Sequence, residues 1–109
     1  MKVFTAFEEG KLVISLKGEL DQHCARKVMD DISGLIDQYM PRDCVLDMSG
    51  VSFMDSSGIA VILRTHRRMN ETGGRVWVEN PARQPYKVIE ASGIERIVRV
   101  SAKMKEVEV

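Results

Sequence analysis

With 109 residues, 44% of them hydrophobic and 29% charged, the chain has the composition of a globular domain. Its 16 basic and 16 acidic side chains balance, which argues against direct binding to nucleic acid or to an anionic membrane surface. No apolar run approaches the roughly 20 residues that span a bilayer, so we expect one domain over residues 1–109 and no membrane segment.

The two cysteines and two histidines fit no metal or cofactor pattern. Cys24 and Cys44 are not part of a C-x-x-C motif, and His23 and His66 stand at no ligand spacing. Glycine-rich phosphate-binding and dinucleotide-binding motifs are also missing from the sequence. We therefore expect no metal, no cofactor and two buried free thiols, which fits a reducing cytoplasm.

The N-terminal part predicts a hairpin followed by a helix. Residues 3–7 and 12–17 are expected to form antiparallel strands, because a short turn containing Gly10 joins them. A helix is expected over residues 22–39, with Asp21 as its N-cap. Its buried side should carry Ala25, Val28, Met29, Ile32, Leu35 and Ile36.

The remaining chain predicts alternating strands and helices. Strands are expected at residues 44–48 and 75–79, helices at 57–70 and 82–91, a short last strand at 97–98, and a short helix or frayed tail from Ser101. Strand–helix–strand units of this length give parallel pairs with right-handed crossovers. We therefore expect an α/β domain with a small mixed sheet, an antiparallel N-terminal hairpin, and helices mainly on one face.

A polar turn lies between the strand at residues 44–48 and the next helix. Its residues are Asp55, Ser56, Ser57 and Gly58. One interpretation is a helix cap and nothing more, since Asp and Ser oxygens accept hydrogen bonds from the free N–H groups of a helix start. The other is a binding site. Two adjacent hydroxyls stand where one would suffice, Gly58 leaves room for a partner, and helix starts attract anions.

Asp21 has the same ambiguity, because it also follows a strand and precedes a helix. If the two strands are neighbours, Asp21 and Asp55 lie on one rim of the sheet, and we expect Asp47, Met54 and Ser56 there too. The rim is then either a pair of independent caps or one acidic surface that a basic partner could bind. The basic residues Arg64, Arg67 and Arg68 are interpreted as a solvated helix face.

An enzymatic role for the serines is disfavoured. A serine nucleophile needs a neighbouring base. His66 lies ten residues after Ser56, roughly 15 Å along the helix axis. His23 could lie near the same end of the sheet, but no G-x-S-x-G turn is present. We expect no catalytic residues.

The motifs resemble those of a known family. Residues 47–63 closely resemble the signature of the STAS domain, and Gly18-Glu19-Leu20-Asp21 resembles its G-x-L-D motif after the second strand. Gly73-Gly74 matches its helix stop. Within that family the chain is similar to the anti-sigma factor antagonists of bacterial sporulation and stress pathways.

The resemblance implies partner switching. The unmodified antagonist binds an anti-sigma factor that is a serine kinase, and a sigma factor is released. The kinase then phosphorylates a serine at the start of the second helix, and a serine phosphatase resets the system. By motif this serine is Ser56, with Ser57 as the runner-up. The residues expected to contact the kinase are Asp21, His23, Met54, Asp55, Ser56, Ser57 and Gly58.

Other functions stay open at this point. A STAS module can also bind a small molecule, a nucleotide or a different regulatory partner, although the short chain favours a stand-alone regulator. The half-exposed sheet face leaves room for a weak homodimer. A hydrolase using Ser56 is the reading that the sequence favours least.

Overall fold

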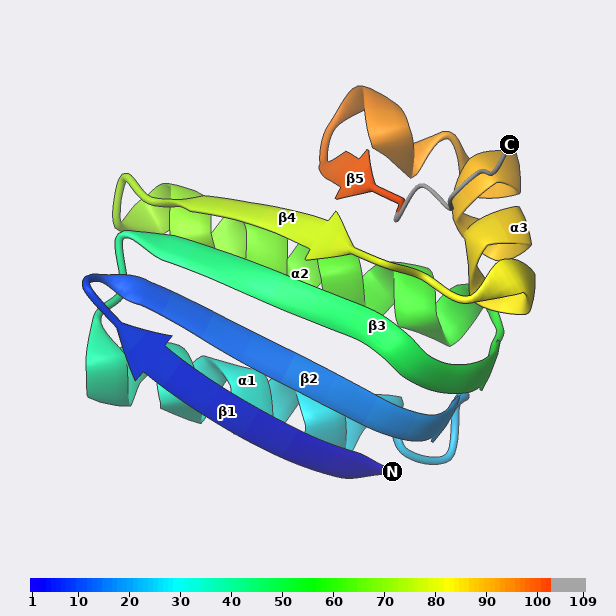
Figure 1. Cartoon of the computed structure of the whole chain (residues 1–109), viewed down its shortest axis with the longest axis horizontal. Helices are drawn as coiled ribbons and strands as arrows, with labels where there is room; N and C mark the ends of the chain where they lie inside the picture. The colour runs from blue at the N-terminus through cyan, green and yellow to red at the C-terminus, as the bar shows by residue number, and fades with distance from the viewer. Residues whose placement is uncertain (103–109) are drawn as a thin grey trace, which may run out of the picture.

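The computed structural model describes residues 1–102, which form one mixed sheet with the strand order β1-β2-β3-β4-β5 (Figure 1). The β1–β2 pair is antiparallel and the other pairs are parallel, as the sequence predicts. In chain order the elements are β1 (Lys2–Glu8), β2 (Lys11–Leu20), α1 (Ala25–Tyr39), β3 (Asp43–Met54), α2 (Ser56–Glu71), β4 (Arg75–Glu79), α3 (Arg83–Ser92), the 3-10 helix η1 (Ile94–Arg96) and β5 (Arg99–Ser101).

Helices α1 and α2 lie behind the sheet in Figure 1, whereas its front face carries no helix. Side chains alternate along β2: Leu12, Ile14 and Leu16 are at most 1% exposed, while Val13 and Ser15 on the other face are half-buried. The core therefore lies between the sheet and the two helices, and the prediction of one uncovered sheet face is confirmed. Helix α3 lies at the end of β3, beyond this layer.

Strand β3 is longer than expected, and this changes the rim. The prediction ended it at Met48, but it continues to Met54, and its last residues pair with the end of β2 through two register shifts. Val51 and Met54 are fully buried along this extension, so it is a packed strand despite its turn-like Ser and Gly composition. Asp47 therefore pairs in mid-strand with Ser15, and its expected place on the rim is wrong.

Other boundaries also differ from the expectation. Strand β2 continues to Leu20 instead of ending at residue 17, because its end pairs with the extension of β3. Helix α1 begins at Ala25 rather than residue 22, and its N-cap is Cys24 rather than Asp21, because residues 21–24 form a separate turn. The last strand occupies Arg99–Ser101 instead of residues 97–98, since η1 occupies the chain just before it. The helix or frayed end expected beyond Ser101 falls on residues 103–109, outside the described residues. Within residues 1–102, no helix is long and apolar enough to cross a membrane.

Candidate functional site

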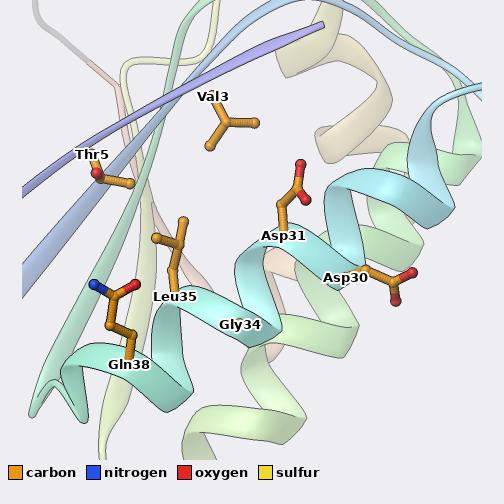
Figure 2. A pocket seen from close by; sticks show the side chains of 7 residues that line it. All are labelled: Val3, Thr5, Asp30, Asp31, Gly34, Leu35 and Gln38. Atoms are coloured by element: carbon orange, nitrogen blue, oxygen red, sulfur yellow. The ribbon is translucent and has the colours of Figure 1, made fainter.

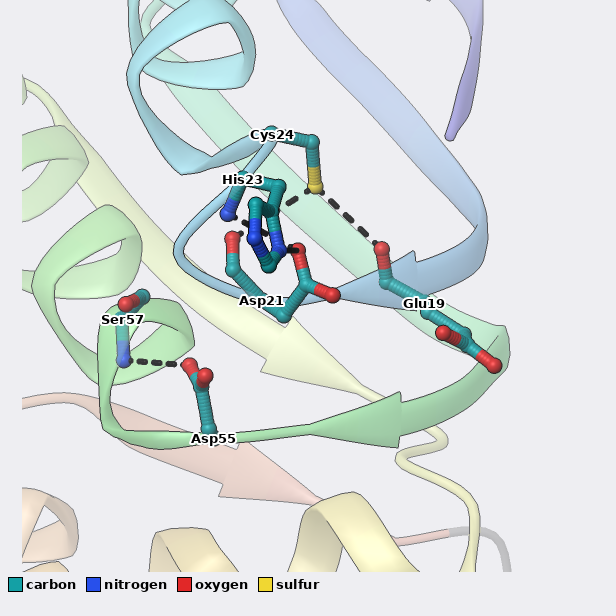
Figure 3. Close-up of polar contacts among 6 residues, drawn as sticks. All are labelled: Glu19, Asp21, His23, Cys24, Asp55 and Ser57. Atoms are coloured by element: carbon teal, nitrogen blue, oxygen red, sulfur yellow. Dashed lines mark hydrogen bonds and ion pairs between the residues drawn. The ribbon is translucent and has the colours of Figure 1, made fainter.

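The turn between β3 and α2 is closed by Asp55. Its backbone is extended, and its side-chain Oδ1 accepts a hydrogen bond of 2.8 Å from the amide of Ser57 (Figure 3). The Asp55 carbonyl also accepts a bond from the Gly58 amide at 3.0 Å. Asp55 is thus the N-cap of α2, one of the interpretations that the sequence offered, and the helix begins at Ser56, one residue before the expected start at 57.

The two serines differ in their surroundings. Ser56 is exposed, and within residues 1–102 its hydroxyl makes no hydrogen bond. Ser57 is half-buried, and it lines a groove of about 290 Å³ between the first turns of α1 and α2, together with Arg26 and Arg64. Ser56 is therefore the more accessible hydroxyl, while the Asp55 carboxylate is already engaged as a cap.

Met54 and Gly58 support the turn from within. Met54 is 0% exposed and Gly58 is buried, so their place in the structure is below the surface of the turn, and their contact with a partner stays a prediction. A Cβ at Gly58 would lie 2.2 Å from Met54 Cγ and 3.2 Å from Leu20 Cδ2. Glycine is needed at this position because α2 starts directly against buried side chains of β2 and β3.

Asp21 and Asp55 lie on one rim, as the sequence predicted. Leu20 and Met54 are paired as neighbouring strand ends, and the amide of Asp55 donates to the carbonyl of Leu20 at 3.3 Å. Each aspartate follows directly after one of these paired residues, and Figure 3 shows both beside the turn. The two aspartates are therefore parts of a single surface.

Local hydrogen bonds fix the charge of Asp21. The backbone amide of His23 donates to Asp21 Oδ1 at 2.9 Å, and this bond lowers the pKa of Asp21. The His23 ring nitrogen Nδ1 lies 3.6 Å from the same oxygen, and 83% of this side chain is exposed. Asp21 is therefore ionised at neutral pH, beside an imidazole that projects into solvent.

The histidines and cysteines are engaged elsewhere than at the serines. His66 contacts Asn70 at 3.2 Å, and within the described chain neither histidine is hydrogen-bonded to Ser56 or Ser57.

Burial raises the pKa of Cys44 to about 12, so this thiol stays protonated. Cys24 is only half-buried and donates to the Glu19 carbonyl at 3.2 Å, so one of the two thiols expected to be buried is not.

Comparison with known proteins assigns the family. The STAS domain model matches residues 4–107. The chain belongs to the STAS domain family. An anti-sigma F factor antagonist from Lysinibacillus sphaericus is 36% identical over 83 residues, covering 76% of this chain and 71% of that protein.

Solved structures agree with this family. The anti-sigma factor antagonist SpoIIAA in its unphosphorylated form is 28% identical, with a TM-score of 0.78 over 94% of this STAS domain and 90% of that chain. The phosphorylated form of SpoIIAA, described as a Bacillus cell fate determinant, is also 28% identical, with a TM-score of 0.69 over 94% and 93% of the two chains. Both forms share the fold of this STAS domain.

Sequence reasoning missed one residue that positions the site. Gln84 of α3 accepts a hydrogen bond from the Met54 amide at 2.8 Å and donates one to the Met54 carbonyl at 3.0 Å. The end of β3 is therefore held by a side chain 30 residues away. No local pattern reveals such a contact, because it depends on where α3 packs.

The basic residues of α2 behave as a solvated face. Arg68 forms ion pairs with Asp37 of α1 and, at 3.5 Å, with Glu71 of its own helix. Arg64 and Arg67 are exposed. Arg64 lines the groove that Ser57 also borders, whereas Arg67 and Arg68 lie further along α2.

Proposed function

We propose that this STAS domain is an anti-sigma factor antagonist controlled by phosphorylation of Ser56. Its unmodified form binds an anti-sigma factor that is a serine kinase, and a sigma factor is released. The kinase phosphorylates Ser56 and thereby ends the binding, and a serine phosphatase restores the unmodified form. The names of the relatives support the antagonist role, and the exposed, uncommitted hydroxyl of Ser56 is the observation that carries the switch.

The position of Ser56 suits a modification that leaves the fold intact. A phosphoserine adds about 1.5 to 2 negative charges and three acceptor oxygens. At the first residue of α2 these charges meet the positive end of the helix dipole, which tolerates them. The Asp55 cap does not need the Ser56 hydroxyl, so phosphorylation does not remove a contact that holds the helix.

The same position is poor for a partner that must pack against the rim. The new phosphate would stand beside Asp55 and on the same rim as the ionised Asp21. A kinase surface that fits the unmodified rim would have to desolvate this added charge without a paired cation. Binding is then lost through repulsion and desolvation at the interface, with no refolding of the STAS domain.

Five of the seven contact residues suggested by the sequence are at least partly exposed. Asp21, His23, Asp55, Ser56 and Ser57 remain as candidates for direct contact. Met54 and Gly58 are buried, and their close packing determines how near the start of α2 lies to the sheet.

Phosphosite mapping tests the proposal. The full chain is incubated with ATP and a serine-kinase anti-sigma factor, and the modified residue is identified by mass spectrometry. We expect one phosphate on Ser56, its loss in Ser56→Ala, and its retention in the matched variant Ser57→Ala. Phosphate on Ser57 would overturn the site assignment, and no incorporation would overturn the switch.

A further inference from the structure

Strand β1 is a free sheet edge. It stands first in the strand order, and among residues 1–102 nothing pairs with its outer side (Figure 1). Every residue of β1 except Val3 is exposed, including Phe4 at 51% and Phe7 at 42%. Proteins usually protect such an edge with proline, a bulge or an inward-pointing charge, because its unpaired N–H and C=O groups can bind another strand. β1 contains no proline, and its pairing with β2 is unbroken.

The sequence of this edge is complementary to itself. If two copies of β1 run antiparallel about Thr5, all seven residues find a partner. Lys2 then lies opposite Glu8 of the second copy, at both ends of the pair. Phe4 lies opposite Ala6, and Val3 lies opposite Phe7. Opposite charges facing each other across antiparallel strands stabilise the pair, so the charges favour this register.

The space beneath β1 fits the same arrangement. An open cavity of about 490 Å³ lies between β1 and α1; in Figure 2 Val3 and Thr5 point from the strand towards it and Leu35 points up from the helix, whose Asp30, Asp31 and Gln38 also line it. Helix α1 therefore leaves the inner face of the edge strand partly uncovered. Strand side chains alternate between faces, so Phe7 of the second copy would lie on the Val3 side, at the mouth of this cavity.

We propose that two copies of this chain associate through antiparallel pairing of their β1 strands, in the register that places Lys2 opposite Glu8 of the second copy. Phe7 of the second copy stays against Tyr39 of its own α1, at a centroid distance of 4.9 Å, and borders the cavity without filling it. The result is one continuous sheet across a two-fold axis, with the same surface used by both copies. Strand β2 separates this edge from β3 and the Ser56 turn, so both turns of the dimer stay free. The dimer uses the sheet edge rather than the open sheet face.

Charge reversal tests the proposed register. The full chain is examined by sedimentation equilibrium from low micromolar to millimolar concentration, and circular dichroism melting verifies that each variant is folded. We expect a concentration-dependent dimer whose dissociation constant rises roughly tenfold or more in Lys2→Glu and in Glu8→Lys, because each change places like charges opposite each other twice per dimer. The double variant Lys2→Glu with Glu8→Lys should restore the wild-type value.

Two further variants separate this edge from other surfaces. Glu90→Lys makes the same charge change at an exposed position of α3, away from β1, and should leave the dissociation constant unchanged. Phe7→Ala should weaken the dimer, since the ring opposite Val3 of the second copy is lost from each copy; because it also removes the contact with Tyr39 of the same chain, its melting curve must show a folded domain. A wild-type chain that stays monomeric throughout, or a dimer indifferent to Lys2→Glu and Phe7→Ala, would overturn the proposal. If Glu8→Lys does not fold, Lys2→Glu alone tests the proposal. Lys2→Glu is expected to fold, because it replaces a Lys–Lys pair with Lys17 in the monomer by a Glu–Lys pair.

Discussion

The side-chain amide of Gln84 holds the main chain of Met54 through two hydrogen bonds, of 2.8 and 3.0 Å. It gives the last residue of β3 the donor and acceptor that a neighbouring strand would have supplied. Met54 in turn packs under Gly58 at the start of α2. The turn that carries Ser56 is therefore fixed both from α3 and from the core.

Loss of the Gln84 amide should destabilise the domain. Gln84→Ala leaves the partly buried amide and carbonyl of Met54 without their partners, which should lower the free energy of unfolding by about 1–3 kcal/mol. Urea denaturation measures the change. Gln38→Ala is the matched control, because Gln38 is exposed and makes no hydrogen bond within residues 1–102, and it should be nearly neutral. Equal effects of the two changes would refute the role of Gln84.

Alanine at Gly58 and at Gly34 should have opposite effects. At Gly58 the new Cβ would lie 2.2 Å from the fully buried Met54 side chain, so we expect a loss of about 1–3 kcal/mol despite the better helix propensity. Gly34 lies inside α1 with no atom within 4 Å of such a Cβ, so alanine there should stabilise by up to about 1 kcal/mol. Thermal melting of both variants measures the effects, and a stabilising Gly58→Ala would contradict the packing described.

The Asp55 cap predicts a difference between two substitutions. Asp55→Ala removes the oxygen that accepts the Ser57 amide and should cost about 1 kcal/mol. Asp55→Asn keeps an acceptor in the same place and should cost only a few tenths of that amount, since Asn caps helices as well as Asp does. Guanidinium denaturation compares them at neutral pH. Equal stabilities of Asp55→Ala and Asp55→Asn would contradict the role of Asp55 as the N-cap.

The buried carboxylate of Asp43 predicts an acid sensitivity. Burial alone would raise its pKa, but the hydrogen bond and charge of Arg75, with the charge of Arg42, outweigh it and lower the pKa below 3.8. Because the folded-state pKa is depressed, the stabilisation is complete above about pH 3.8 and is lost as the pH falls through the folded-state value. Asp43→Asn should cost about 1 kcal/mol at pH 7, from the weakened charge-assisted hydrogen bonds.

The pH dependence of that difference is the measurement. Denaturation of wild type and Asp43→Asn at pH 7 and again below pH 3.8 should show the two stabilities converging in acid. A difference that stays constant with pH would show that the ionisation of Asp43 does not contribute.

The sequence predicted what depends on local chemistry. The sequence offered a helix cap at Asp55 and a helix start within one residue of the observed one, because capping involves side chains and amides only two residues apart. The shared rim with Asp21 followed from the order of the strands alone. These features need no knowledge of packing.

What depends on tertiary contacts was not predictable. The extension of β3 through Val51 and Met54 is stabilised by burial against other elements, whereas its own Ser and Gly residues favour a turn. The buried state of Gly58 and the clamp from Gln84 likewise depend on where α2 and α3 pack. The sequence therefore located the surface of the site but not the layer that supports it.

The central claim is that a phosphate on Ser56 abolishes binding without unfolding the domain. Isothermal titration of a serine-kinase anti-sigma factor with the unmodified chain, the enzymatically phosphorylated chain, Ser56→Ala and Ser56→Asp tests it most directly, with circular dichroism of each form. We predict tight binding by the unmodified chain and by Ser56→Ala, binding weakened at least roughly a hundredfold by phosphate and more modestly by Asp, and unchanged spectra. Equal affinity of the phosphorylated and unmodified chains would contradict the account.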